Sequence, residues 1–301
     1  MPGTTESIQR RVKFDFEIEF SNGGGIQGQD FRLDIEGNDI SDAALADYIV
    51  KDMRLLMVGT VRILRKQVFL EKHKRAKPAV GAVASGFVDL SHTIESGMVT
   101  YKGIPGPRIE DFLTREDSRK HYAPGTEFHI ASISMVANTG TYLDTPFHRF
   151  AGAGDLADLA LARSANIEAV VVRAVGARAV TADHFSSIDV RGKAVLVQTG
   201  WDRHWRTDAY FVDSPYLTAD AARYLIDHGA VIVGIDSLNI DDTRDKTRPV
   251  HSLLLKAEIQ IVEHLCNLES LPDTRLRFFA VPVKVRGMGT FPVRAFAIVG
   301  P

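Results

Sequence analysis

The chain has 301 residues, enough for one large domain or for an ordinary domain with a smaller one attached. Hydrophobic residues make up 45% of it, which excludes disorder throughout, and a formal net charge of −2 gives no reason to expect nucleic acid or a membrane as a partner. The single cysteine, Cys266, cannot form an internal disulfide, which is typical of a reducing compartment. Residues 1–13 lack the apolar stretch of a signal peptide, and no run approaches the ~20 apolar residues of a membrane span, so we expect a cytoplasmic protein.

Residues 14–71, which follow a polar tail at 1–13, predict a small ββαβ subdomain. Apolar and polar residues alternate over 14–20 and again over 31–35, with a Gly-rich loop between, as expected for two half-buried strands. A polar residue can then cap an amphipathic helix, and one or two further strands follow over 61–70. A subdomain of about sixty residues is marginal alone, so we expect it to pack on the rest of the chain or on another subunit.

Residues 72–86 form a linker candidate, because this segment is basic at first and then rich in alanine and glycine. From residue 87 the pattern becomes that of a larger mixed α/β domain, which we place at 87–301. Several of its strand-like runs are apolar throughout, as expected when both faces of a strand are buried. The predicted strands lie at 87–90, 132–136, 169–172, 194–198, 231–235, 278–283 and 294–299, and the clearest helix patterns lie at 218–228 and 259–266.

The segment 138–148 follows an apolar strand and gathers polar side chains around a glycine and a proline. Its sequence is Asn-Thr-Gly-Thr-Tyr-Leu-Asp-Thr-Pro-Phe-His. Gly140 permits a tight turn and Pro146 cannot occupy a central strand, so the segment predicts a loop after a strand, where catalytic groups usually lie. An ordinary turn with a capping aspartate and a surface histidine fits the same pattern.

His251 and Glu263 form a second candidate pair further along the chain. His251 precedes one apolar run, and Glu263 lies inside another, close to Val262 and Leu265. A carboxylate among apolar residues needs a partner or a raised pKa. The alternative is a helix that carries Glu263 on its solvated face.

Residues 87–299 resemble the kynurenine formamidase-like cyclase family, which includes the isatin hydrolases. Several motifs in the right order carry the resemblance, whereas residues 1–86 match nothing in it. The resemblance implies the swivelling β/β/α fold of that family and assembly as a homo-dimer or homo-tetramer. The motifs are Asp89-Leu-Ser-His92, 138–148, Gln198-Thr-Gly-Trp201, 233–238, 251–265 and Pro292-Val-Arg294.

The family pattern for the first long motif is His-x-Gly-Thr-His-x-Asp-x-Pro-x-His. Its first two histidines and its aspartate bind a divalent metal, and its last histidine moves a proton. Carried over, Asp144 takes the place of the ligand aspartate and His148 that of the catalytic histidine. The later His251 and Glu263 complete the metal site, which is binuclear in some members.

Asn138 and Tyr142 stand where the family has its two histidine ligands. Neutral imidazole is a good zinc ligand, whereas asparagine offers a carbonyl oxygen and a neutral phenol binds zinc poorly. A reduced site of Asp144, His251 and Glu263 would suit manganese, magnesium or weakly held zinc. From the two replacements we expect no metal cofactor, with manganese or zinc as the alternative.

Three functions remain open at this point. In the first, a metal-independent enzyme cyclises, dehydrates or isomerises a small carbonyl, amide or lactone-type compound, with Asn138 and Tyr142 donating to a substrate oxygen. His148 would then move a proton, with Asp144, His251 or Glu263 tuning it. The second is a divalent-metal-dependent amidohydrolase of the arylformamidase or isatin hydrolase type. The third is a non-catalytic protein that binds a small molecule.

Four further side chains are candidates for contact with the small-molecule substrate. His92 could line the pocket, although a core or capping histidine explains it equally. Arg294 could pair with the substrate or with a carboxylate of the protein. Aromatic side chains, with Phe147 and Trp201 as the candidates nearest to the motifs, could form an apolar wall for a flat substrate.

Overall fold

The computed structural model describes residues 8–35, 37–53, 55, 57–72 and 86–300. The chain divides into two compact units, Met1–Gly81 and Ala82–Pro301, and each is described by itself. The predicted linker lies almost entirely outside the described residues, as do residues 1–7 of the predicted polar tail. Among the described residues no helix is long and apolar enough to cross a membrane.

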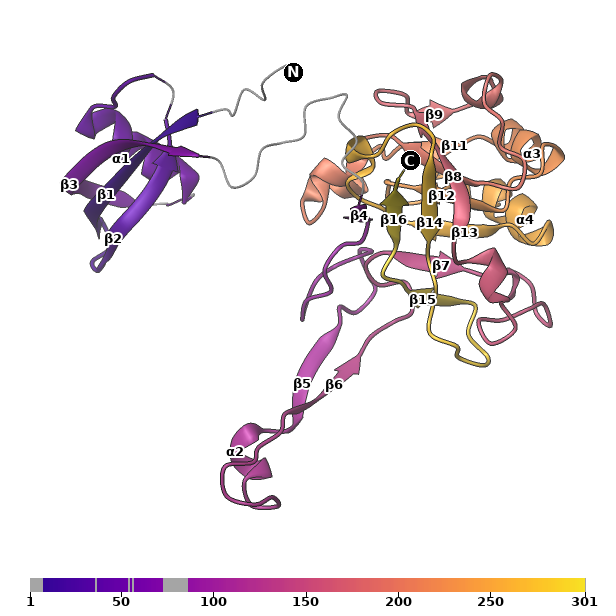
Figure 1. The fold of residues 1–301 in the computed structure, drawn as a ribbon, viewed down its shortest axis with the longest axis horizontal. Coiled ribbons are helices and arrows are strands. Elements are labelled where there is room, and N and C mark those ends of the chain that lie inside the picture. Colours follow the sequence, from indigo (N-terminus) through magenta and orange to yellow (C-terminus); the bar gives the residue numbers. More distant parts are fainter. Residues whose placement is uncertain (1–7, 36, 54, 56, 73–85, 301) are drawn as a thin grey trace. The chain divides into compact units, whose positions relative to one another are not determined.

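The first unit is a three-stranded antiparallel sheet with one helix, in the order ββαβ (Figure 1). Its elements are β1 (Ile8–Phe20), β2 (Gly25–Asp34), α1 (Asp42–Asp52) and β3 (Val58–Lys72), with strand order β2-β1-β3. Val12, Phe14 and Ile18 alternate inward along β1 and pack with Leu45 and Ile49 of the helix. The first strand therefore begins earlier than expected, because Val12 belongs to its buried face.

The second unit is built on a nine-stranded mixed sheet with order β15-β7-β13-β12-β10-β8-β14-β16-β4. Its centre, β8-β10-β12-β13, is parallel, and the flanking strands pair antiparallel. All five residues of β10 are buried, as expected for a strand covered on both faces. The strands are β4 (Gly86–Asp89), β7 (Tyr142–Asp144), β8 (Ile167–Arg173), β10 (Ala194–Gln198), β12 (Ile232–Ile235), β13 (Gln260–Glu263), β14 (Leu276–Phe279), β15 (Thr290–Pro292) and β16 (Phe296–Val299).

Two helices, α3 (Ala219–Asp227) and α4 (Pro249–Lys256), pack beside each other on one face of this sheet (Figure 1). A second apolar cluster fills the other face and includes Leu143, Leu196 and Val262. Two short strands, β9 (Ala179–Val180) and β11 (Tyr216–Leu217), pair in parallel. The α/β class expected from the sequence is confirmed, with few helices around a large sheet.

A hairpin projects from this unit, away from the nine-stranded sheet (Figure 1). It consists of β5 (Arg108–Leu113) and β6 (Ile130–Ser134), with the short helix α2 (Arg115–Ser118) in the connection between them. Nearly every residue of both strands is exposed. The hairpin therefore contributes little to the core of its own unit.

The helix predicted at 259–266 is wrong, because this segment contains the strand β13. All four residues of β13 are buried, and a short run that is apolar on both faces does not reveal its period. The helix lies earlier, in α4, which starts with Pro249 at its first turn, where a missing N–H costs nothing. The strands predicted from residue 87 onward are present, with their ends shifted by up to four residues.

Candidate active site

Antiparallel pairing between β7 and β13 places the side chains of the site on one face of the sheet. Ile261 lies opposite Asp144, and Glu263 lies opposite Tyr142. Directly paired residues, and residues two apart on one strand, share a face of a sheet. Tyr142, Asp144 and Glu263 therefore point to the same side, and all three are buried.

His251, on α4, completes the cluster from the helical side. Its Nε2 atom lies 3.8 Å from Asp144 Oδ2 and 3.7 Å from Glu263 Oε1. Its Nδ1 atom is 2.7 Å from Asp241 Oδ2. The Asp241 carboxylate also accepts the backbone N–H groups of Val250 and His251 at the start of α4. Asp241 thus fixes the ring so that Nε2 faces the two other carboxylates.

His148 joins the cluster through Thr290. The Thr290 hydroxyl donates to Asp144 Oδ1 and lies 2.8 Å from His148 Nδ1. His148 Nδ1 lies 3.8 Å from Asp144 Oδ1. About a third of the His148 side chain is exposed, whereas Asp144 and Glu263 are enclosed. His148 is therefore the group that connects the buried cluster to solvent.

Buried negative charge dominates this cluster. The carboxylates of Asp144, Asp241 and Glu263 converge on the imidazole of His251. Burial opposes a charge on that ring, but the negative charge of Glu263 and the interactions with Asp144 and Asp241 outweigh it and raise the pKa of His251 to about 10. Burial also opposes the charge of Glu263 and therefore raises its pKa, whereas the nearby His251 lowers it. Asp144 Oδ2 is buried and has no hydrogen-bond partner among the described residues.

Tyr142 donates its hydroxyl proton to Glu263 Oε2 at 2.5 Å. Burial raises the pKa of Tyr142 well above its usual value, so the phenol keeps that proton. Its oxygen also lies 3.1 Å from the hydroxyl of Tyr101. Asn138, at the other replaced position, is partly buried on the loop that leads to β7.

The four candidates for substrate contact lie in different surroundings. His92 stacks on Trp205 with a centroid distance of 4.0 Å, and burial lowers the pKa of His92 to about 4. Trp201 Nε1 donates to the Tyr210 carbonyl. Arg294 is mostly exposed and pairs with Asp89 at 2.6 Å. Phe147 sits beside His148 in a short 3-10 turn, Pro146–His148, and is partly buried. A surface pocket of about 390 Å³ is lined by both His92 and Arg294.

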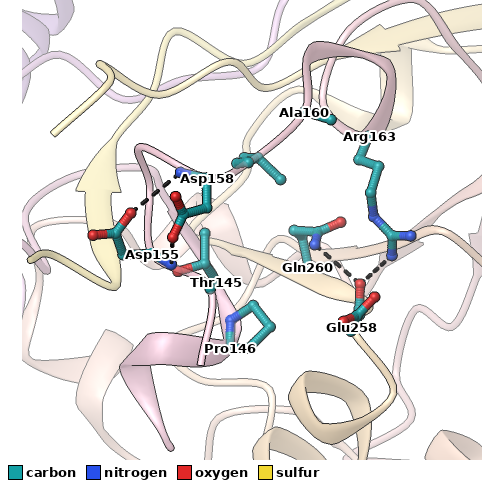
Figure 2. A pocket seen from close by; sticks show the side chains of 10 residues that line it. Thr145, Pro146, Asp155, Asp158, Ala160, Arg163, Glu258 and Gln260 are labelled. Carbon is teal, nitrogen blue, oxygen red and sulfur yellow. Dashed lines mark hydrogen bonds between the residues drawn. The ribbon is translucent and has the colours of Figure 1, made fainter. Parts of the chain in front are cut away.

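A separate pocket of about 150 Å³ lies beside the turn that follows Asp144 (Figure 2). Asp155 and Asp158 stand on one of its walls, and Arg163 and Gln260 on another (Figure 2). The residues that line it do not include Asp144, His251 or Glu263. This pocket is therefore distinct from the buried cluster.

Three residues of the cluster were not predicted from the sequence. Asp241 follows the buried strand β12 in a polar stretch, a position typical of functional side chains and the one usable signal. Thr290 and Tyr101 are far from their partners along the chain, and nothing in their own sequence neighbourhood marks them.

Gly289 allows the close approach that places Thr290 against His148. A Cβ atom at position 289 would lie 2.2 Å from the His148 backbone nitrogen, and the Gly289 carbonyl accepts from Thr145 N at 2.7 Å. We predict that Gly289→Ala lowers the free energy of unfolding by about 1–3 kcal/mol, the usual range for overpacking, in urea denaturation. Gly154→Ala, where the nearest atom would be 3.9 Å away, is the matched control and should change it little. Equal effects of the two would show that this close approach is absent.

Comparison with known proteins places the chain in a family. The family model described as "Putative cyclase" matches residues 88–242, more than half of the chain. Kynurenine formamidase of Bacillus cereus is 23% identical over 215 residues, covering 70% of this chain and 96% of the relative.

Two solved structures share the fold of this chain. A structure described as a potential metal-dependent hydrolase with cyclase activity has a TM-score of 0.60 and 25% identity, covering 72% of this chain and 100% of its own. Isatin hydrolase A of Labrenzia aggregata has a TM-score of 0.61 and 22% identity, covering 72% and 94%. The family match, together with the kynurenine formamidase relative, shows that the chain belongs to the kynurenine formamidase-like cyclase family and is a cyclase-family enzyme.

Proposed function

We propose that this enzyme acts on an amide-type bond of a small carbonyl compound, with one divalent cation held by Asp144, His251 and Glu263. The observation that carries the proposal is the buried Asp144 Oδ2 atom, which lacks a hydrogen-bond partner among the described residues and faces His251 Nε2. The relatives named kynurenine formamidase and isatin hydrolase support an amide or lactam as the substrate class.

The donor set supports a cation. His251 Nε2 lies 3.7 Å from Glu263 Oε1 and 3.8 Å from Asp144 Oδ2, and both distances are too long for hydrogen bonds. They are a few tenths of an ångström longer than the spacing of neighbouring ligand atoms around one divalent ion, roughly 3.0–3.4 Å for metal–ligand bonds of about 2.1 Å, so a small inward movement would complete the site. One imidazole nitrogen and two carboxylates favour manganese, or zinc held weakly. The ligand atoms of Asp144, His148 and His251 all lie within 4.8 Å of one another, and Glu263 joins this group through its contact with His251.

This proposal replaces the metal-independent enzyme that we favoured from the sequence. A metal-independent enzyme needs Tyr142 to donate to a substrate oxygen, but Tyr142 donates its proton to Glu263 inside the protein. A bound cation would instead polarise a substrate carbonyl and lower the pKa of a bound water. Asp241 would orient His251. The partly exposed His148, held by Thr290, would transfer a proton between the bound water and the substrate.

The metal-independent enzyme remains the second candidate, because one observation favours it. The raised pKa of His251 lets a protonated imidazole neutralise part of the negative cluster without any cation. A protonated imidazole cannot also bind a metal, so the two candidates exclude each other at His251.

We predict that protein purified without chelators contains about one manganese or zinc ion per chain, measured by elemental analysis. Asp144→Asn should not retain the ion, because it removes a buried ligand. Its kcat/KM on aryl formamides and lactams should fall at least about a hundredfold. His148→Ala should keep the ion and lose turnover. Glu258→Gln, an exposed acidic residue beside β13, is the control and should change neither.

Two results would contradict the proposal. Turnover that survives complete removal of metal, while His148→Ala is inactive, would establish the metal-independent enzyme instead. Binding of a substrate with no turnover in any metal state would establish the non-catalytic alternative.

We further propose that the enzyme forms a homo-dimer or homo-tetramer, with the hairpin β5–β6 in the interface. Ile109, Phe112 and Ile133 on this hairpin are 43%, 77% and 51% exposed. A two-stranded ribbon is marginally stable in water unless it packs on something, and grouped apolar side chains typically mark an interface.

A cytoplasmic location, expected from the sequence, also stays a prediction.

We predict that Phe112→Asp combined with Ile133→Asp reduces the mass in solution towards the 33.2 kDa monomer, because the charges oppose burial. Light scattering after size-exclusion chromatography measures this mass. The control Val175→Asp changes another exposed apolar side chain of the same unit and should leave the assembly intact. A wild-type monomer, or an unchanged assembly in the double variant, would rule out this interface.

A further inference from the structure

Two tyrosine hydroxyls lie together beside Glu263. The Tyr142 hydroxyl is 2.5 Å from Glu263 Oε2, and the Tyr101 hydroxyl is 3.1 Å from that of Tyr142 and 3.5 Å from the same carboxylate oxygen. Tyr101 comes from the loop between β4 and β5 (Arg108–Leu113), far from both partners in the sequence. The fold therefore brings this loop into contact with Tyr142 and Glu263.

The short contacts determine how the protons are arranged. Tyr101 has one hydroxyl proton, and its shortest contact, at 2.5 Å, is with the carbonyl of Leu238. Asn239 Nδ2 donates to the Tyr101 oxygen at 2.9 Å. The proton of Tyr142 is then the one that Glu263 accepts. Tyr101 is thus held at both its donor and its acceptor side, and forms a fixed neighbour of the Tyr142 hydroxyl.

Glu263 is in turn fixed at both oxygens. Oε2 accepts from Tyr142, and Oε1 accepts from the backbone N–H of Ile240 at 2.6 Å. These bonds prevent rotation of the carboxylate and leave Oε1 directed at His251 Nε2, 3.7 Å away. The polypeptide from Leu238 to Ile240 therefore holds Tyr101 at one end and Glu263 at the other.

We propose that Tyr101 is a positioning residue for the cation site and acts on Glu263 through the segment from Leu238 to Ile240, whose Ile240 N–H holds Glu263 Oε1. The inference rests on the proposed function, since it assigns Tyr101 to the same site. Groups that hold a ligand carboxylate in one orientation set the affinity of the site, because the ligand then loses less freedom on binding.

A purely structural role for Tyr101 predicts a different outcome. Its ring packs edge-on against His264, with a centroid distance of 5.5 Å, so the residue also anchors its loop. Phenylalanine would preserve that packing and remove the hydroxyl alone. A hydroxyl that merely anchored the loop would change stability but not the affinity of the folded protein for a cation.

The test is a double-mutant cycle on the full-length protein, with Mn²⁺ affinity measured by calorimetry. Tyr142→Phe should weaken binding by about tenfold, the lower limit for loss of a group that orients a ligand. Tyr101→Phe should weaken it by less, and the double variant should bind no more weakly than Tyr142→Phe alone, because both hydroxyls restrain the same Glu263 carboxylate and its orientation is lost once the stronger restraint is removed.

Tyr210→Phe is the matched control. Its hydroxyl is also buried, but it bonds to His264 Nδ1 at 2.8 Å, so affinity should stay within about twofold of wild type. Unchanged affinity in Tyr101→Phe, or losses that multiply in the double variant, would overturn the proposal.

The failure of the proposed function gives a separate result. If the wild type binds no Mn²⁺, the proposed cation site is wrong. The same double-mutant cycle is then evaluated from the midpoint of thermal unfolding of the metal-free protein. The hydrogen bonds exist without a cation, so the midpoint losses of the two variants should then be less than additive. Additive losses would overturn the positioning role of Tyr101 as well.

Discussion

The site depends on the antiparallel pairing of β7 (Tyr142–Asp144) with β13 (Gln260–Glu263). Its register sets Asp144 opposite Ile261 and Glu263 opposite Tyr142, so two carboxylates and a phenol share one face. A shift of one residue would turn these side chains into the opposite apolar layer, where Leu143 and Val262 now pack. The same apolar layer that stabilises the sheet therefore also fixes the chemistry on its other side.

Burial of negative charge is the second constraint. Moving a carboxylate out of water costs on the order of several kcal/mol, and three of them surround His251. The protein offsets part of this cost with backbone N–H groups of Val250, His251 and Ile240. What remains must be balanced by a proton on His251 or by a cation. The surroundings of Asp144 Oδ2, which has no partner among the described residues, favour the cation.

The sequence predicted the parts of this structure whose signals are local. Strand β10 (Ala194–Gln198) was predictable because it is apolar throughout, and Asp144 with His148 because motif spacing carries them. The strand β13 was mistaken for a helix, since a short run buried on both faces has no visible period. Thr290 and Tyr101 could not be predicted, because they reach the cluster only through long-range packing. The role of Tyr142 as a donor to Glu263 likewise depends on strand register rather than on residue type.

The central claim is that Asp144, His251 and Glu263 together hold one divalent cation. The most direct test is a crystal structure of the full-length protein grown with Mn²⁺, with data collected at a wavelength where manganese scatters anomalously. The account predicts one anomalous peak bonded to oxygen atoms of Asp144 and Glu263 and to His251 Nε2, with Tyr142 still bonded to Glu263. The absence of a peak there, with His251 Nε2 hydrogen-bonded directly to a carboxylate, would contradict it.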